Sequence, residues 1–472
     1  MRRLRHLREA LRHAQPQAIA TSAEEAQGDP GAPVLLSDEQ VQRFVADGYL
    51  QIQLEDDDGI SHRAIHREAW RLWQSSGEAF GAGVGNDIYP AIPQLGNVMS
   101  SPRVAGALAS LLGEGYTMEP HRQMHNSTEN TPPRGQQDLH KDTQRGKPPN
   151  HLPRSCFVFY FPAGCTEEMG PTELIPGSHF LSVDDQDWSV ISNAPAMLGP
   201  NVISTKLTSA VHQPFAVISH QAMIHRGCAR LTDEDEDMAP WRPMMKFIFS
   251  RGSECAPRWD HHPESVRPFA EFATEAALVP AMEATWDWLL DQEPHSRVAE
   301  LPSQQEVDAL LADLTAQNIK ADEAMRVRAS YSLGRFAQRG SDVALSALLD
   351  ALSSPESSDA ARRVAAPGLQ AAGSAALCGL CETLRVSMDY RVLMYGADAL
   401  GEAACRTPTL SNEVEGTLRC TVEKLKQMSA ASPRLQKWAA AGGPSRSPWE
   451  FAEDTAIDSC MTALSKIAQK RE

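Results

Sequence analysis

The 472-residue sequence lacks any apolar run that approaches the roughly eighteen residues needed to cross a bilayer, so we expect no membrane-spanning segment. Positive charge is also in short supply. The chain has 44 Lys and Arg against 61 Asp and Glu, and its formal net charge is −17. Because an acidic surface repels phosphate backbones, we expect no general nucleic-acid binding. Gly (30) and Pro (32) are too few for a collagen-like or low-complexity chain.

Cysteine is sparse, and its nine copies are an odd number scattered over a long chain. This usage indicates reduced thiols inside the cell, and we expect a cytoplasmic location. The first residues, MRRLRHLREALRHAQ, are rich in Arg and place Leu4, Leu7 and Leu11 on one helical face. They fit either a frayed, solvated helix or an organelle transit peptide, and no apolar secretion segment is present.

The pattern predicts a flexible tail over residues 1–34, of which the Ala-, Gly- and Pro-rich part from residue 15 is typical of a linker. Regular structure is expected to begin at Ser37, which forms a capping-box pattern with Gln40 ahead of a helix that ends at Gly48. A second helix is expected over residues 61–76.

From about residue 116 to 255 the pattern is strand-like. Short apolar, β-branched or aromatic runs are separated by Gly and Pro turns, namely CFVFYF, STKLTSAV, FAVIS and MMKFIF. Several such strands with irregular connections favour a double-sheet jelly roll. We therefore expect an α+β chain with a jelly-roll domain over residues 35–295.

The texture changes to Ala- and Leu-rich helix after Pro302, which predicts an all-α domain over residues 302–472. A weak repeat aligns Leu333, Leu369 and Leu400, with spacings of 36 and 31 residues, as in HEAT-like helical arrays. An irregular helical bundle is the alternative, and Pro367 inside the second copy weakens the repeat or marks a kink. We expect the concave surface of such an array to bind a protein partner or to self-associate.

Three histidines precede an acid by two positions: His66, His140 and His262. His66 lies in an expected helix, where residues two apart diverge by about 200° and cannot share a metal. His262 precedes a proline in a polar loop. Only His140 and Asp142 lie where an extended backbone directs both side chains to one face.

A facial triad of two histidines and one carboxylate also needs a distal histidine, which His220 or His225 can supply. Such a triad leaves three positions on iron for a bidentate co-substrate and dioxygen. Arg242 stands at the start of a predicted strand, where its guanidinium can hold the remote carboxylate of a dicarboxylate co-substrate.

Four segments, read in order, resemble the phytanoyl-CoA dioxygenase family of iron(II)/2-oxoglutarate oxygenases. They are LSDEQVQRFVADGYL (36–50), DLHKD (138–142), MGPTELIPGSH (169–179) and MIHRG (223–227). The resemblance covers roughly residues 35–255, and GPTELIPGSH is its most specific part. It implies that His140, Asp142 and His225 bind Fe(II) and that Arg242 binds 2-oxoglutarate.

The resemblance further implies a dioxygenase that consumes O2, oxidatively decarboxylates 2-oxoglutarate to succinate and CO2, and hydroxylates a small-molecule substrate. The resembling halogenases lack the carboxylate so that chloride can bind, so Asp142 favours hydroxylation. In this family an aromatic residue often lies beside the co-substrate, and Phe157 fits that position, although core packing explains it equally well.

Two details depart from the family pattern or compete with these assignments. The family usually places its arginine nearer the distal histidine, whereas 17 residues separate His225 from Arg242 and include the acidic run 233–237. Arg230 is therefore a competing candidate. His179, in the PGSH turn, is expected to be a hydrogen-bonded turn residue rather than a metal ligand.

Two other readings of the chain stay open from the sequence. In one, the helical array is a scaffold that carries an inactive oxygenase-like domain, although the intact triad argues against it. In the other, the chain is a non-redox, cupin-like binding protein with another metal. The pair Cys378 and Cys381 has no second pair nearby in the sequence, and we expect it to be buried core rather than a metal site.

Overall fold

The structure is a computed structural model. It describes residues 32–57, 59–76, 85–126, 137–142, 148–183, 188–199, 202–230, 242–252, 259–291, 301–316, 319–405, 407, 411–431 and 452–471. The Arg-rich N-terminal segment, nearly all of the expected 1–34 tail and the acidic run 233–237 lie outside the described residues.

The first described helix, α2 (Asp38–Asp47), has the predicted capping box. The Ser37 hydroxyl accepts a hydrogen bond from the backbone N–H of Gln40, and the Gln40 side chain accepts one from the backbone N–H of Ser37. Gly48 ends the helix with a φ of 83°, a left-handed conformation that favours glycine. The second predicted helix is α3 (His62–Ser76). Three short helices follow it: α4 (Ile88–Ala91), α5 (Gln94–Met99) and α6 (Pro102–Leu112).

Two antiparallel sheets form the predicted jelly roll. The larger has the order β1-β6-β3-β8-β2, and the smaller has the order β5-β4-β7. The strands of the larger sheet are β1 (Tyr49–Gln53), β2 (Thr117–Asn126), β3 (Ser155–Phe161), β6 (Phe215–His220) and β8 (Pro243–Ser250). Those of the smaller sheet are β4 (Thr172–Leu174), β5 (Thr205–Lys206) and β7 (His225–Gly227).

The alternation of side chains along β3 divides the core into two parts. Phe157, Phe159 and Phe161 point between the sheets, where they join Leu174 of β4 in one apolar cluster. The intervening residues of β3 point to the opposite face of the sheet and pack in a second cluster with the surrounding helices. The interior of the jelly roll is therefore lined by aromatic rings.

The other elements that the structure describes are helices. Next to the jelly roll lie α7 (Trp188–Ile191), α8 (Ala194–Leu198) and α9 (Val279–Leu289). The C-terminal part, called the helical region below, contains α10 (Gln304–Thr315), α11 (Ile319–Gln338), α12 (Asp342–Ser353), α13 (Asp359–Ala372), α14 (Leu377–Val386), α15 (Tyr390–Cys405), α16 (Ser411–Ala431) and α18 (Ala452–Arg471).

The structure bears on several predictions for the helical region. Helix α13 runs through Pro367 without ending there. Cys381 is buried as expected, but Cys378 is exposed because it faces outward from α14. Residues 359–386 include a stretch that is long and apolar enough to cross a membrane, yet 67% of it is buried inside the protein, as in a core helix. The HEAT-like repeat stays a prediction.

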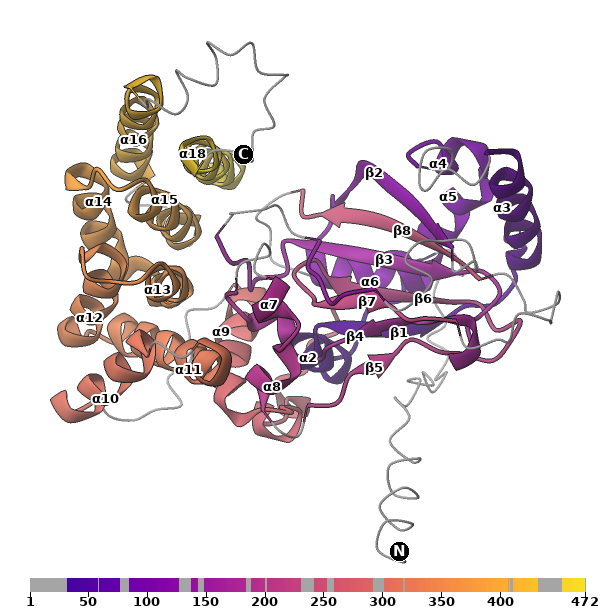
Figure 1. Cartoon of the computed structure of the whole chain (residues 1–472), viewed down its shortest axis with the longest axis horizontal. Helices are drawn as coiled ribbons and strands as arrows, with labels where there is room; N and C mark the ends of the chain where they lie inside the picture. Colours follow the sequence, from indigo (N-terminus) through magenta and orange to yellow (C-terminus); the bar gives the residue numbers. More distant parts are fainter. Residues whose placement is uncertain are drawn as a thin grey trace, which may run out of the picture.

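The helical region and the jelly roll share a core along a contact surface that we call the seam. Helix α11 packs against α8 and α9, as Figure 1 shows. Its residues Ala324, Val327 and Tyr331 belong to the apolar cluster on the outer face of the large sheet. A second cluster fills the helical region itself. The α11 helix is therefore part of both halves of the molecule.

Helices α11 and α13 cross at two glycines. A methyl group at Gly334 would overlap the backbone carbonyl of Gly368, and one at Gly368 would lie 2.5 Å from the carbonyl oxygen of Ser330. We expect Gly334→Ala to lower the free energy of unfolding by about 1–3 kcal/mol, because the two backbones must separate. Chemical denaturation of the full chain measures this.

Gly416, in the middle of α16, is the matched control because nothing lies within 4 Å of a methyl group built there. Gly416→Ala should raise the free energy of unfolding by about 0.5–1 kcal/mol through helix propensity alone. If both substitutions stabilise the chain, the close crossing of α11 and α13 is wrong.

Candidate metal centre

Backbone pairing brings the two predicted histidine ligands together from distant parts of the sequence. The N–H of His140 donates to the carbonyl of His225 at 2.9 Å, and the N–H of His225 donates to the carbonyl of His140 at 3.0 Å. This antiparallel bridge extends the small sheet, because His225 also pairs with Leu174 of β4. The two imidazole rings lie side by side, with centroids 4.4 Å apart.

Each imidazole is oriented by a backbone carbonyl. Nδ1 of His140 lies 3.0 Å from the carbonyl oxygen of Asp138, and Nδ1 of His225 lies 3.0 Å from that of Met223. A proton on each Nδ1 satisfies these carbonyls, which leaves the lone pair of each Nε2 for a metal. Both rings therefore present the same nitrogen to the same space.

Asp142 completes the group. Its Oδ2 lies 3.4 Å from Nε2 of His225, and its Oδ1 lies 3.8 Å from Nε2 of His140. One ligand atom from each of the three residues lies within 4.8 Å of the others. Ligands about 2.1 Å from a common ion are about 3 Å apart when they subtend a right angle, so small side-chain adjustments suffice. Among the described residues this is the one group of three or more His, Cys, Asp or Glu residues that can hold a metal ion.

The protonation states suit metal binding. Burial, together with the adjacent His225, lowers the pKa of His140, which favours the neutral ring. Burial alone would raise the pKa of Asp142, but the adjacent His225 and the charge of Lys246 hold that pKa well below its usual range. A neutral imidazole and an ionised carboxylate are the forms that ligate metals.

Lys246 is a functional candidate that the sequence reasoning missed. Its Nζ donates to Oδ2 of Asp142 at 2.7 Å, and it lies 5.3 Å from the ring centroid of Phe157. The signal was present in MMKFIF, since Lys246 is the one charged residue of an apolar strand and shares the inward face with Arg242 by the two-residue period. On the neighbouring strand β2, burial and the charge of Lys246 lower the pKa of His125 to about 3.

Arg242 is a buried cation at the entry to β8, with only 4% of its surface exposed. One terminal nitrogen donates to the carbonyl of Gly170, while Nε has no hydrogen-bond partner among the described residues. Within the described part of the chain, no carboxylate forms an ion pair with it. Burial lowers its pKa, which reflects the cost of a charge without a counter-ion.

The structure places the other predicted site residues as follows. Phe157 is fully buried in the interior, with its ring 6.3 Å from that of His225. Arg230 is partly exposed, beyond the end of β7. His220 lies away from the triad, where its Nε2 contacts the carbonyl of Leu152 and its ring faces His179. The turn residue His179 contacts the carbonyl of Val45 through Nε2 and is no part of the triad.

Part of the chain matches a known protein family. Residues 17–237 match the profile of the family described as Phytanoyl-CoA dioxygenase (PhyH). No curated protein matches the chain.

Among solved structures, the chain is similar to several proteins at low identity. The non-heme alpha ketoglutarate dependent carbocyclase SnoK from nogalamycin biosynthesis is 18% identical, with 47% of this chain and 88% of that chain covered and a TM-score of 0.35. The epimerase SnoN in complex with Fe3+ and alpha ketoglutarate is 19% identical, with 49% of this chain and 91% of that chain covered and a TM-score of 0.35. HygX from Streptomyces hygroscopicus with nickel and 2-oxoglutarate bound is 13% identical, with 46% of this chain and 87% of that chain covered and a TM-score of 0.33.

Removal of the carboxylate should abolish metal binding. We expect Asp142→Asn to weaken the binding of Co2+ by more than about 100-fold, because a neutral amide oxygen is a poorer ligand than a carboxylate. Calorimetric titration under argon measures the affinity. Asp138→Asn is the matched control, since Asp138 orients His140 only through its backbone carbonyl. Equal affinities for the two variants would contradict the site.

Proposed function

We propose that the chain is an iron(II)/2-oxoglutarate-dependent dioxygenase that hydroxylates a small-molecule substrate and converts 2-oxoglutarate to succinate and CO2. The observation that carries the proposal is the combination of two features on the inner surface of one jelly roll. One is a group of three metal-ligating side chains, His140, Asp142 and His225. The other is the buried guanidinium of Arg242, which lacks a carboxylate partner among the described residues.

In this proposal Nε2 of His140, Nε2 of His225 and the Asp142 carboxylate hold the iron on one face. Two neutral nitrogens and one charged oxygen make the mixed donor set that non-heme ferrous sites use. When bound, the iron would activate O2, and 2-oxoglutarate, which is oxidised to succinate and CO2, would supply two of the four electrons that reduce it. Lys246 keeps the Asp142 carboxylate in place through its hydrogen bond of 2.7 Å to Oδ2.

Arg242 suits the distal carboxylate of 2-oxoglutarate. Its unpartnered Nε and its charge both favour an anion, and the planar guanidinium pairs with a carboxylate through two parallel hydrogen bonds. Phe157, Phe159 and the other aromatic rings of the interior exclude water from this space. A dry interior strengthens the attraction between the arginine and the co-substrate.

Hydroxylation is the proposed outcome because Asp142 occupies the carboxylate position that a halide would need. Other oxidations, such as ring closure or epimerisation, use the same co-substrate chemistry, and product analysis distinguishes them. We also infer a domain division into residues 1–34, 35–295 and 302–472, a cytoplasmic location, and a helical region that contacts a protein partner or a second copy.

The first test is anaerobic titration of the full chain with Fe(II) and 2-oxoglutarate. We expect a weak metal-to-ligand absorption band that His140→Ala abolishes, because one of the two nitrogen ligands is lost. His262→Ala is the matched control, since His262 also precedes an acid by two positions but is exposed at the surface. If wild type gives no band and forms no succinate in air with any of a broad substrate panel, the chain is instead a scaffold.

The second test separates the two arginine candidates. Arg242→Met should weaken 2-oxoglutarate binding to the metal-loaded protein by about 10-fold or more, because a charge-assisted pair inside the protein is lost. Affinity for Co2+ alone should stay unchanged. Arg230→Met is the control and should bind 2-oxoglutarate as wild type does. The opposite ranking of the two variants would transfer the role to Arg230.

A further inference from the structure

A single peptide group connects the metal-ligand motif to the helical region. The carbonyl oxygen of Leu181 accepts a hydrogen bond from Nζ of Lys141 at 2.7 Å. The N–H of the same peptide group, which belongs to Ser182, donates to Oε1 of Glu323 at 2.9 Å. Lys141 stands between His140 and Asp142, whereas Glu323 lies on α11.

Each hydrogen bond involves an ionisable side chain; the bond from Ser182 to Glu323 is buried, and the bond from Lys141 to Leu181 is partly buried. Glu323 is 1% exposed, and Ser182 is 2% exposed. A cation at the carbonyl and a carboxylate at the N–H polarise the peptide group in the same direction, so each bond strengthens the other. Arg326 of α11, 3.4 Å from Oε2 of Glu323, provides the carboxylate with a second partner.

The segment after Asp142 is held from the same side. Nε2 of His151 lies 3.1 Å from the Ser182 hydroxyl, and Nδ1 of His151 lies 3.0 Å from the hydroxyl of Tyr331 on α11. Three residues further on, Arg154 pairs with the buried Glu402 of α15. The chain is therefore linked to the helical region at Lys141, through the Leu181–Ser182 peptide group, and contacts it directly at His151 and Arg154.

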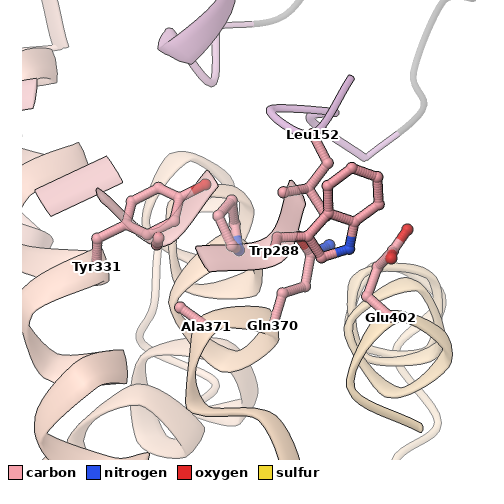
Figure 2. A pocket seen from close by; sticks show the side chains of 8 residues that line it. Leu152, Trp288, Tyr331, Gln370, Ala371 and Glu402 are labelled. Atoms are coloured by element: carbon pink, nitrogen blue, oxygen red, sulfur yellow. The ribbon is translucent and has the colours of Figure 1, made fainter. Parts of the chain in front are cut away.

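Figure 2 shows a pocket at the seam where these segments meet. Leu152 and Trp288 approach it from the jelly-roll side, and Tyr331, Gln370, Ala371 and Glu402 face them from the helical region. Leu152 follows His151 directly, and its carbonyl oxygen contacts Nε2 of His220. Residues 151–154 thus lie between the jelly roll and the helical region.

We propose that Glu323 is a positioning residue for the metal centre, acting through the Leu181–Ser182 peptide group on Lys141. Along an extended backbone, Lys141 points away from the face that carries His140 and Asp142. Anchoring its side chain to the seam fixes the backbone from which both ligands project. The helical region is then a structural component of the metal centre. This inference rests on the proposed function.

The test compares substitutions on either side of the peptide group in the full chain. Glu323→Ala removes the acceptor and should weaken Co2+ binding by about 10-fold or more, as loss of groups that orient metal ligands does. Glu323→Gln keeps an oxygen acceptor and should restore affinity to within about threefold of wild type. Lys141→Met should weaken binding as Glu323→Ala does, and the double variant should be no worse than either.

Arg335→Met is the matched control for general loosening of the seam. Arg335 lies on the same helix, α11, and pairs with Glu283 of α9, away from the ligand motif. Arg335→Met should lower thermal stability yet leave the Co2+ affinity and the visible Co2+ spectrum unchanged. Glu323→Ala should change both the affinity and the spectrum, because the geometry of the ligands is altered.

Each outcome decides between the proposals. If Glu323→Ala binds Co2+ as wild type does, or if Arg335→Met weakens binding equally, the positioning role is overturned while the proposed function stands. If Glu323→Ala does not fold, Lys141→Met tests the same connection without altering the helical region. A wild-type chain that binds no Co2+ overturns the proposed function, and this inference with it.

Discussion

The pair of backbone hydrogen bonds between His140 and His225 is the interaction on which the candidate site depends. It joins two segments separated by 85 positions and sets both imidazoles on the inner side of the small sheet. Because backbone pairing decides the register, a shift of one strand by one residue would turn its histidine to the opposite face, away from the other. The pairing of β7 with β4 supports that register from the other side.

The interior of the jelly roll carries an uneven set of charges. It contains one carboxylate of the candidate site, Asp142, and two cations, Lys246 and Arg242, and both cations are almost fully buried. A metal dication would increase this positive excess, and two like charges about 4 Å apart repel by about 4 kcal/mol at an effective dielectric constant of 20. A dicarboxylate bound to the metal and to Arg242 offsets the excess. The charge distribution thus favours joint occupation by metal and co-substrate over metal alone.

Features that arise from neighbouring residues were predictable, whereas those that depend on the three-dimensional arrangement were not. The capping box at Ser37 and the strand CFVFYF follow from local chemistry and period, and the structure has both. The link between Lys141 and Glu323 spans 182 positions and passes through a peptide group whose side chains take no part. No pattern along the chain marks such a contact. The role of Lys246 could have been predicted from the sequence, since a lysine at an inward strand position needs a partner.

The contacts across the seam also connect the jelly roll to the helical region. Tyr331 and its neighbours on α11 pack in the apolar cluster on the outer face of the large sheet, so removal of the helical region would expose apolar surface there. The ion pair between Arg154 and Glu402 is buried in the seam, where the loss of one partner typically costs about 3–5 kcal/mol. Lys466 of α18 also pairs with Glu402, which extends this network to the last described helix. A jelly roll without its helical region would therefore leave the Ser182 N–H without Glu323 and Arg154 without Glu402.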